Sequence, residues 1–249
     1  IKWIKKLVGS DEFINGKARW CLWLVNISLE ELKDHPFIME KVEKVKQMRL
    51  ASKDDGANKL AERPHQFRDV QNPEQYILVP SVSSERRRYV PIGFLDSSTI
   101  TTNANFMIPN ASLYDFAILT SVIHNDWMRM VAGRLEMRYR YSATIVYNTF
   151  PWPQNIGPQR REQIEKLAKE ILRARARYPD KTLAELYDPD KMPADLLEAH
   201  ETLDRAVEKL YRDAPFRDST ERVEYLFKLY EKLINEEKNK KKKNSGEIK

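Results

Sequence analysis

The most informative pattern in this chain is the alternation of apolar and polar side chains along residues 133–148, GRLEMRYRYSATIVYN. Successive residues of a strand point to opposite sides, so a strand drawn through this segment has two unlike faces. One face would carry Leu135, Met137, Tyr139 and Tyr141. The other would carry Glu136, Arg138, Arg140 and Ser142. We therefore predict a strand with one buried face and one row of hydrogen-bonding groups.

The remaining pattern divides the chain near residues 150–158, where the proline-punctuated FPWPQNIGP ends a β-rich part and begins a helical one. Four segments rich in aromatic and branched residues predict strands at 18–25, 76–80, 89–95 and 135–147. The first part also predicts helices at 29–52 and 113–130, with Ser112 and Asp115 as a capping box for the second helix and Gly133 as its end.

The second part predicts three amphipathic helices that share a core, with apolar stripes at 164–172, 196–210 and 223–234. The fold class is therefore α+β: a mixed α/β domain over 1–153, followed by an α-helical domain over 154–249. His200, beside the second stripe, is interpreted as a hydrogen-bonded core histidine. Asp188, Asp190 and Asp195 lack the spacing of a calcium loop and are interpreted as turn residues.

Composition permits a nucleic-acid partner without requiring one. The 249 residues include 43 Lys plus Arg and 37 Asp plus Glu, a net charge of +6, and much of the excess lies in a C-terminal basic tail, Lys238 and Lys240–Lys243. We expect this tail to be solvated and to act at most as a weak phosphate anchor. A single cysteine, Cys21, excludes an internal disulfide and a zinc cluster, and it favours the reducing cytoplasm.

Membrane and catalytic signals are missing from the sequence. No apolar run reaches the length of a membrane span and no signal peptide opens the chain, which begins with Ile and is interpreted as a fragment. No glycine-rich phosphate loop, GxSxG, HExxH or zinc-deaminase pattern occurs. An adenine-N6 methyltransferase needs an Asn-Pro-Pro-aromatic type of motif, and the chain has no Pro-Pro pair. We predict no metal site and no catalysis by this chain alone.

The charged row suits the edges of DNA bases. Neighbours on one strand face lie about 6.6 Å apart, close to two base-pair rises, and a β-ribbon fits the major groove. Arg can bind guanine O6 and N7 while Glu accepts from the cytosine amino group, so Glu136 and Arg138 together could read one G·C pair. The alternative is an exposed edge strand whose charges serve solubility.

Other basic and aromatic residues have weaker assignments. Arg86, Arg87 and Arg88 are expected to contact phosphates, and structural ion pairs are the alternative for each. Arg49 and Lys53 are further phosphate candidates, although a solvated helix face explains their segment better. The tryptophans are interpreted as core residues rather than stacking platforms: Trp20, Trp23, Trp127 and Trp152.

Several ordered motifs connect these segments. The first part contains SSERRRYVPIGFL at 83–95, Trp127, GRL at 133–135, YRYS at 139–142 and VYNTFPWP at 146–153. The second part contains ARARYPD at 174–180, LYDP at 186–189, MP at 192–193 and AHETLD at 199–204. Over nearly the whole chain, from FING at 13–16 and RWCLWL at 19–24 to about Tyr230, this succession resembles MmeI-like enzymes, the Type IIL branch of Type IIG restriction-modification proteins.

The resemblance implies that this chain is the non-catalytic C-terminal third of a single polypeptide that joins a nuclease, an adenine-N6 methyltransferase, a target-recognition domain and a helical domain. It implies that Glu136 and Arg138 read one base pair of double-stranded DNA and that Arg140 reads another together with Ala104. The parent enzyme would use S-adenosylmethionine and Mg²⁺ in its upstream domains. Two alternatives stay open: a specificity subunit of a multi-chain modification enzyme, and a helical protein-interaction module with no role on DNA.

Overall fold

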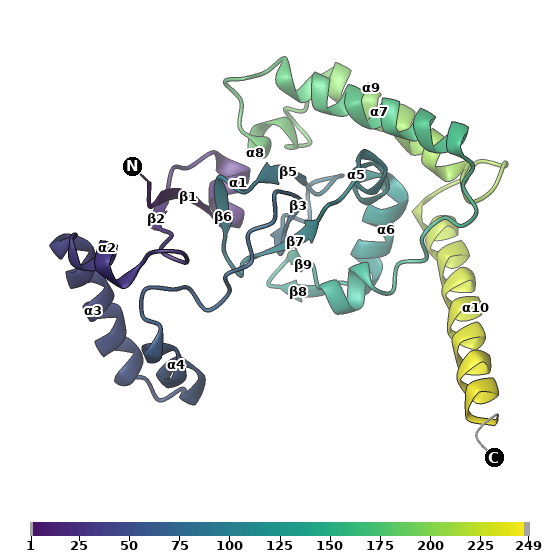
Figure 1. The fold of residues 1–249 in the computed structure, drawn as a ribbon. Coiled ribbons are helices and arrows are strands. Elements are labelled where there is room, and N and C mark those ends of the chain that lie inside the picture. Colours follow the sequence, from purple (N-terminus) through teal and green to yellow (C-terminus); the bar gives the residue numbers. More distant parts are fainter. Residues whose placement is uncertain (1, 247–249) are drawn as a thin grey trace.

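Three small sheets form the centre of the molecule (Figure 1). The computed structural model describes residues 2–246, except for the side chains of Leu29 and of residues 240–246. In the first sheet, β1 (Ile4–Val8) lies between antiparallel β2 (Trp20–Leu22) and parallel β6 (Thr99–Thr101). In the second, β3 (Gln75–Pro80) lies between two antiparallel neighbours, β5 (Gly93–Asp96) and β7 (Asn105–Pro109). In the third, β9 (Arg138–Arg140) lies between antiparallel β4 (Val82–Ser83) and β8 (Gly133–Leu135).

Of the predicted strands, only the one at 76–80 is confirmed over its full length, as β3. The segment 18–25 contributes three residues to β2, and residues 89–92 of the third segment form a buried loop before β5. The predicted strand 135–147 is wrong, because β9 ends at Arg140 and a π-helical turn covers Ala143–Tyr147. The strands of all three sheets are therefore short, with two to six residues each.

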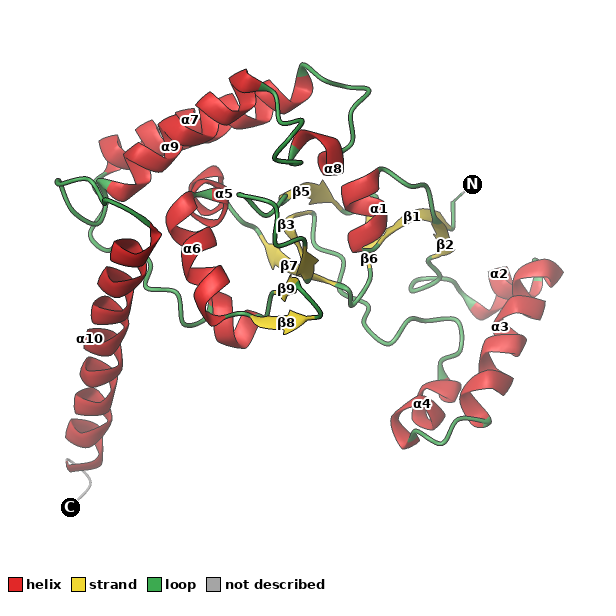
Figure 2. Ribbon diagram, turned by 180° about the vertical axis from the view of Figure 1, so that it is seen from behind, coloured by secondary structure: helices red, strands yellow, loops and turns green. Residues whose placement is uncertain are grey.

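Helices α2 (Leu29–Lys33), α3 (Pro36–Leu50) and α4 (Asp55–Lys59) form an arm beside β2, far from the third sheet in both views (Figures 1 and 2). The single helix predicted at 29–52 is therefore wrong. The break falls before Pro36, the first residue of α3, because proline disfavours helical geometry in the residue that precedes it. Trp20 at the base of this arm is 62% exposed, which corrects its assignment to the core.

The helix predicted at 113–130 is two helices, α5 (Leu113–Thr120) and α6 (Val122–Val131), separated by Ser121 in extended geometry. The capping box of Ser112 and Asp115 is confirmed at the start of α5. Gly133 does not end α6, because the helix stops two residues earlier and Gly133 opens β8. Helix α6 consequently leads into the third sheet through a single extended residue, Ala132.

The C-terminal helices are α7 (Pro158–Ala176), α8 (Leu183–Leu186), α9 (Ala194–Glu208) and α10 (Ser219–Gly246). Helices α7 and α9 pack together over α5, whereas α10 runs separately along α6 (Figures 1 and 2). Trp127 of α6 contacts Phe227 and Tyr230 of α10, with ring centroids 5.0 and 5.8 Å apart. The three helices share a core, as predicted, because Ile164, Leu203 and Leu226 belong to one buried cluster, but that cluster also includes residues of the first part of the chain.

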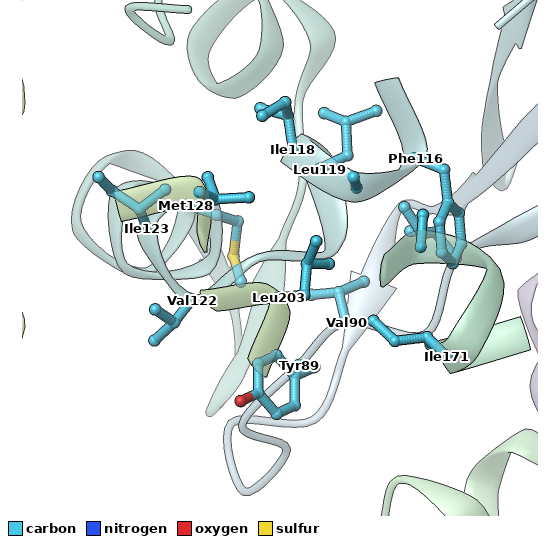
Figure 3. Close-up of a cluster of buried hydrophobic side chains, with 14 of the residues drawn as sticks. Tyr89, Val90, Phe116, Ile118, Leu119, Val122, Ile123, Met128, Ile171 and Leu203 are labelled. Atoms are coloured by element: carbon cyan, nitrogen blue, oxygen red, sulfur yellow. The ribbon is translucent and has the colours of Figure 1, made fainter. Parts of the chain in front are cut away.

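This buried cluster joins the two parts of the chain (Figure 3). It includes Ile171 and Leu203 of the helical part together with Tyr89, Val90 and Phe116 of the first part. The α+β class is confirmed, and its two parts bury apolar surface against each other. His200 is confirmed as a core histidine: it is fully buried, stacks on Tyr89, and its Nε2 lies 2.8 Å from the Tyr187 hydroxyl.

Two further expectations concern charged groups. Asp188 forms a turn, because its carboxylate accepts the Asp190 amide at 2.9 Å, and no cluster of metal-binding side chains occurs among the described residues. The backbone of α10 continues through the basic tail to Gly246, but the side chains of Lys240–Lys243 lie outside the described ones. Within residues 2–246 no helix is long and apolar enough to cross a membrane.

Candidate nucleic-acid interface

The charged row of the sequence lies on a hairpin rather than on one strand. Leu135 of β8 pairs with Arg138 of β9, so Glu136 and Met137 form a two-residue turn between them. This turn corrects the predicted face: Leu135 and Met137 are 44% and 70% exposed, and only the tyrosines of that face are buried. The predicted alternation therefore holds for β9 and fails at its turn, which places Glu136 at the tip.

Glu136 has a left-handed backbone, with φ of 57°. That conformation costs a residue with a Cβ roughly 1–2 kcal/mol, which is why two-residue hairpin turns favour glycine or asparagine at such positions. Met137 has no positive φ, so the strain is confined to the glutamate. A strained residue at an exposed tip indicates that its side chain serves something other than stability.

Glu136 and Arg138 form an ion pair across the turn. Arg138 Nη2 lies 2.8 Å from Glu136 Oε2, and the two side chains are 46% and 77% exposed. Ion pairs in water contribute only about 0–1 kcal/mol to stability. The pair therefore does little for the fold, but it restricts the directions that both charged groups can take.

Arg140 shares the exposed face of β9 with Arg138, since alternate strand residues point to one side. Its cross-strand neighbours are Gly133 of β8 and Val82 of β4. Gly133 has no atom within 4 Å of the position that a Cβ would occupy, so open space lies beside Arg140. No carboxylate among the described residues pairs with the Arg140 guanidinium, which leaves its donors available to a ligand.

The structure brings Ala104 close to Arg140. The Ala104 carbonyl accepts the amide of Ser81 at 3.1 Å, and Ser81 in turn accepts the amide of Tyr141 at 2.8 Å. The residue after Ser81, Val82, is the strand partner of Arg140. Ala104 is exposed in the loop between β6 and β7, so Ser81 connects it to the residue that follows Arg140, although 36 positions separate Ala104 from Arg140 in the sequence.

Buried groups beneath the hairpin fix its position. Tyr139 is buried, and the Arg134 guanidinium lies 3.8 Å from the centre of its ring while donating to the Met137 carbonyl at 3.0 Å. The Tyr141 hydroxyl lies 3.0 Å from Nε2 of buried His124, whose pKa is lowered to about 3 by desolvation. The supporting roles of Arg134 and His124 escape sequence reasoning, even though Arg134 belongs to the GRL motif, because their partners are set by the fold.

The three arginines at 86–88 lie against the C-terminal helices. Arg86 pairs with Asp190 at 2.5 Å and Arg88 pairs with Glu201 at 2.8 Å. Arg87 is half-buried, and desolvation lowers its pKa. These contacts correspond to the structural alternative from the sequence, and the side chains of Arg86 and Arg88 keep about half of their surface exposed. A phosphate contact by any of the three stays a prediction.

Arg49 stabilises the arm that α2, α3 and α4 form. Its guanidinium donates to the carbonyls of Leu60, Arg63 and Gln66 at 2.7, 3.0 and 2.7 Å, and desolvation lowers its pKa. Lys53 is exposed on the same arm. Arg49 belongs to α3 and Lys53 lies between α3 and α4, and this arm is far from β8 and β9 in Figures 1 and 2, so the structure does not bring the two residues together with Glu136 and Arg138.

An exposed, charged hairpin on small sheets, braced by a helical module, is the architecture of a recognition module. Residues 1–154 match the family model of the MmeI target recognition domain, and residues 156–236 match that of the MmeI C-terminal domain. The chain therefore belongs to the MmeI family, and the resemblance found in its sequence is confirmed.

Two relatives of this chain are much longer proteins. It is 45% identical over 234 residues to DNA methyltransferase A of Bacillus subtilis (strain 168), which covers 94% of this chain and 26% of that protein. It is similar, with a TM-score of 0.91 and 42% identity, to the solved Type IIL restriction-modification enzyme MmeI in complex with DNA, over 94% of this chain and 31% of that one. The chain thus spans less than a third of each relative.

Proposed function

We propose that this chain is the sequence-reading module of a Type IIL restriction-modification enzyme and that it binds double-stranded DNA through the hairpin β8–β9. The observation that carries the proposal is the Glu136–Arg138 pair at the exposed tip of a hairpin, in a chain of the MmeI family. A role as a separate helical interaction module is disfavoured, because the C-terminal helices bury apolar residues against the first part of the chain.

The hairpin enters the major groove with its tip toward one C·G pair. Arg138 donates two hydrogen bonds to guanine O6 and N7, and Glu136 accepts from the amino group of the paired cytosine. Each good bidentate contact discriminates against a wrong base by about 1–3 kcal/mol. The 2.8 Å ion pair between them supports this assignment, since it orients both groups before DNA arrives.

Arg140 reads a second base pair with Ala104 at its side. On one strand face, Arg138 and Arg140 are about 6.6 Å apart, close to two base-pair rises. The small side chain of Ala104 and the missing one of Gly133 leave room for Arg140 to reach a base edge. Arg86, Arg87 and Arg88 contact DNA phosphates and so position the protein on the duplex, and Arg86 and Arg88 give up part of their present ion pairing for these contacts.

The chemistry belongs to domains that precede this module in a longer polypeptide, as the length of both relatives supports. A methyltransferase domain there uses S-adenosylmethionine to modify a flipped adenine, and a nuclease domain uses Mg²⁺. The protein acts in the cytoplasm, where Cys21 stays reduced. By itself the 249-residue chain binds duplex DNA weakly and incorporates no labelled methyl groups, and detection of such incorporation contradicts this assignment.

A charge exchange tests the reading pair in the full-length polypeptide. Glu136→Lys with Arg138→Asp is expected to move methylation from sites with C·G to sites with G·C at one position, as seen by methylation mapping of cellular DNA. The matched control exchanges another exposed pair, Glu162→Lys with Lys166→Glu on α7, where Nζ and Oε1 lie 3.0 Å apart. An unchanged recognition sequence with full activity in the first variant shows that the hairpin tip reads nothing.

A further inference from the structure

One buried carboxylate of the helical part contacts two segments of the first part. Asp204 of α9 is 5% exposed. Its Oδ2 accepts the Tyr89 hydroxyl at 2.6 Å and its Oδ1 accepts the amide of Val122 at 2.7 Å. Neither partner belongs to the C-terminal helices, and they lie 115 and 82 residues from Asp204 in the sequence.

Both partners belong to segments that lead to the third sheet. Tyr89 lies in the loop between β4 and β5, and β4 is one of the two neighbours of β9. Val122 begins α6, which continues through Ala132 directly into β8, the other neighbour. Asp204 therefore fixes, through two hydrogen bonds, the segments attached to both flanks of the strand that carries Arg138 and Arg140.

The break between α5 and α6 follows from the same contact. Val122 would donate its amide to a carbonyl of α5 in a continuous helix, but here it donates to Asp204 while the Ser121 hydroxyl bonds the Ile118 carbonyl at 2.6 Å. A carboxylate is favoured at the amino end of a helix such as α6, where amides are unpaired and the dipole is positive. The break sets the direction in which α6 runs toward β8.

A second route connects the same elements. Arg222 of α10 bonds Glu208 of α9 at 2.5 Å and Asp126 of α6 at 3.1 Å. Asp126 also pairs with Arg129 at 3.0 Å, and Arg129 donates to the Arg87 carbonyl at 2.9 Å in the loop after β4. The helical part thus holds α6 and this loop through several polar contacts, and Asp204 bonds both elements directly.

We propose that Asp204 is a positioning residue for base reading, which fixes the distance and angle between the two flanks of β9 and hence the aim of the hairpin tip. This inference rests on the proposed function of the hairpin. The carboxylate stays ionised at neutral pH: burial raises its pKa to about 6, while the donors on Tyr89 and Val122 oppose the rise. Both hydrogen bonds are therefore made to a charged acceptor, which makes them short and strongly directional.

The test measures discrimination in the full-length polypeptide, as the ratio of methylation rates at the recognised site and at sites with one changed base pair. In Asp204→Ala we expect the ratio at the pair read by Glu136 and Arg138 to fall at least tenfold. Asp204→Asn keeps an oxygen for Val122 and is expected to lose less. Tyr89→Phe removes only the hydroxyl, keeps the ring stacked on His200 at 4.1 Å, and is expected to lower the ratio about threefold.

Arg175→Met supplies the matched control. Arg175 also joins the helical part to the first part, since it donates to the Ile92 carbonyl and the Tyr187 hydroxyl at 2.7 Å each. Its partner Ile92, however, leads into β5 of the second sheet, not into the third. We expect Arg175→Met to lower stability without changing the discrimination ratio, which separates positioning from a general loss of structure.

Each outcome decides the inference. An unchanged ratio in Asp204→Ala and Tyr89→Phe overturns it, and so does an equal loss in Arg175→Met. If Asp204→Ala does not fold, the ratio in Tyr89→Phe decides by itself. The charge exchange of Glu136 and Arg138 is measured in parallel. If that exchange alters recognition while the Asp204 and Tyr89 variants do not, positioning fails and the proposed function stands; if the exchange alters nothing, the proposed function fails.

Discussion

The reading hairpin and the junction with the helical part use the same residue types in opposite settings. At the hairpin tip, Glu136 and Arg138 pair in water with 77% and 46% of their side chains exposed. At the junction, Arg222 pairs with Glu208 and Asp126, and the three side chains are 18%, 10% and 6% exposed. The first pair can be exchanged without harm to the fold, whereas loss of Arg222 from the second group leaves Glu208 as a buried carboxylate without its ion-pair partner.

This difference agrees with the proposed roles of the two regions, in which the hairpin reads DNA and the junction holds the hairpin in place. A recognition surface that changes its target needs residues whose replacement leaves the fold intact, and an exposed two-residue turn provides them. The aim of that surface needs rigid support, which buried hydrogen-bonded charges provide because moving or unpairing them is costly. The junction, not the hairpin, is therefore where stability and geometry are decided.

Removal of the junction cation is expected to have the largest effect. Arg222→Ala leaves Glu208 and Asp126 without their shared partner, and breaking a buried pair in this way costs about 3–5 kcal/mol. Urea unfolding of the 249-residue chain measures the change. The control is Arg173→Ala, whose exposed pair with Glu170 is worth at most about 1 kcal/mol. If the free energy of unfolding falls equally in the two variants, the buried pair contributes no more to stability than the exposed one, and the contrast between the two regions is wrong.

Acid is expected to weaken the support beneath the hairpin. The folded pKa of His124 is about 3, below the 6.5 of an ordinary histidine. Its neutral form therefore contributes stability that is complete above pH 6.5 and is lost as pH falls toward 3, at about 1.4 kcal/mol per unit. By pH 4 this loss reaches about 3 kcal/mol.

The matched variant for this titration is His124→Gln, which keeps a polar partner for Tyr141 but has no ionisable group. The free energy of unfolding is measured for both proteins at pH 7 and pH 4, so that all other titrating groups cancel in the difference. A smaller pH-dependent loss in the variant is expected. If both proteins lose the same free energy of unfolding between pH 7 and pH 4, the pKa of His124 is not lowered by folding, which contradicts this prediction.

At the hairpin tip, stability and recognition are expected to move in opposite directions. Glu136→Gly relieves the left-handed strain and should stabilise the chain by roughly 1–2 kcal/mol, while recognition at one base pair is lost. Met137→Gly is the control, because Met137 has no positive φ and glycine there only adds freedom to the unfolded chain. Thermal unfolding measures the change in stability, and methylation mapping measures the change in recognition. If Glu136→Gly is less stable than the parent, the left-handed backbone of Glu136 is not strained.

The smallest effect is expected at Arg86. Its exposed pair with Asp190 contributes at most about 1 kcal/mol, so Arg86→Ala should scarcely change unfolding. A phosphate contact instead predicts weaker binding to every DNA sequence and a salt slope reduced by about one unit. Titration of labelled duplex at several salt concentrations measures that slope, with Arg173→Ala as the control. Altered sequence preference with unchanged affinity moves Arg86 into the base-reading group.

Local features of the fold were predictable from the sequence. The capping box of Ser112 and Asp115, the strand at 76–80 and the amphipathic C-terminal helices depend on neighbours a few residues away. The grouping of Glu136, Arg138 and Arg140 near one another follows from their closeness in the chain. The turn at 136–137 was not predictable, because Leu-Glu-Met-Arg contains none of the glycine or asparagine that marks a two-residue hairpin.

The sequence by itself determined the α+β class, the family and the identity of the charged residues offered for recognition, because these depend on composition, spacing and ordered motifs. Only the tertiary structure decided where α5 ends and α6 begins, that Ser81 connects Ala104 to the residue after Arg140, and that Asp204 holds both flanks of β9. Each of these depends on hydrogen bonds between residues far apart in the chain. No local pattern encodes such a partner, since its position is set only when the whole core has packed.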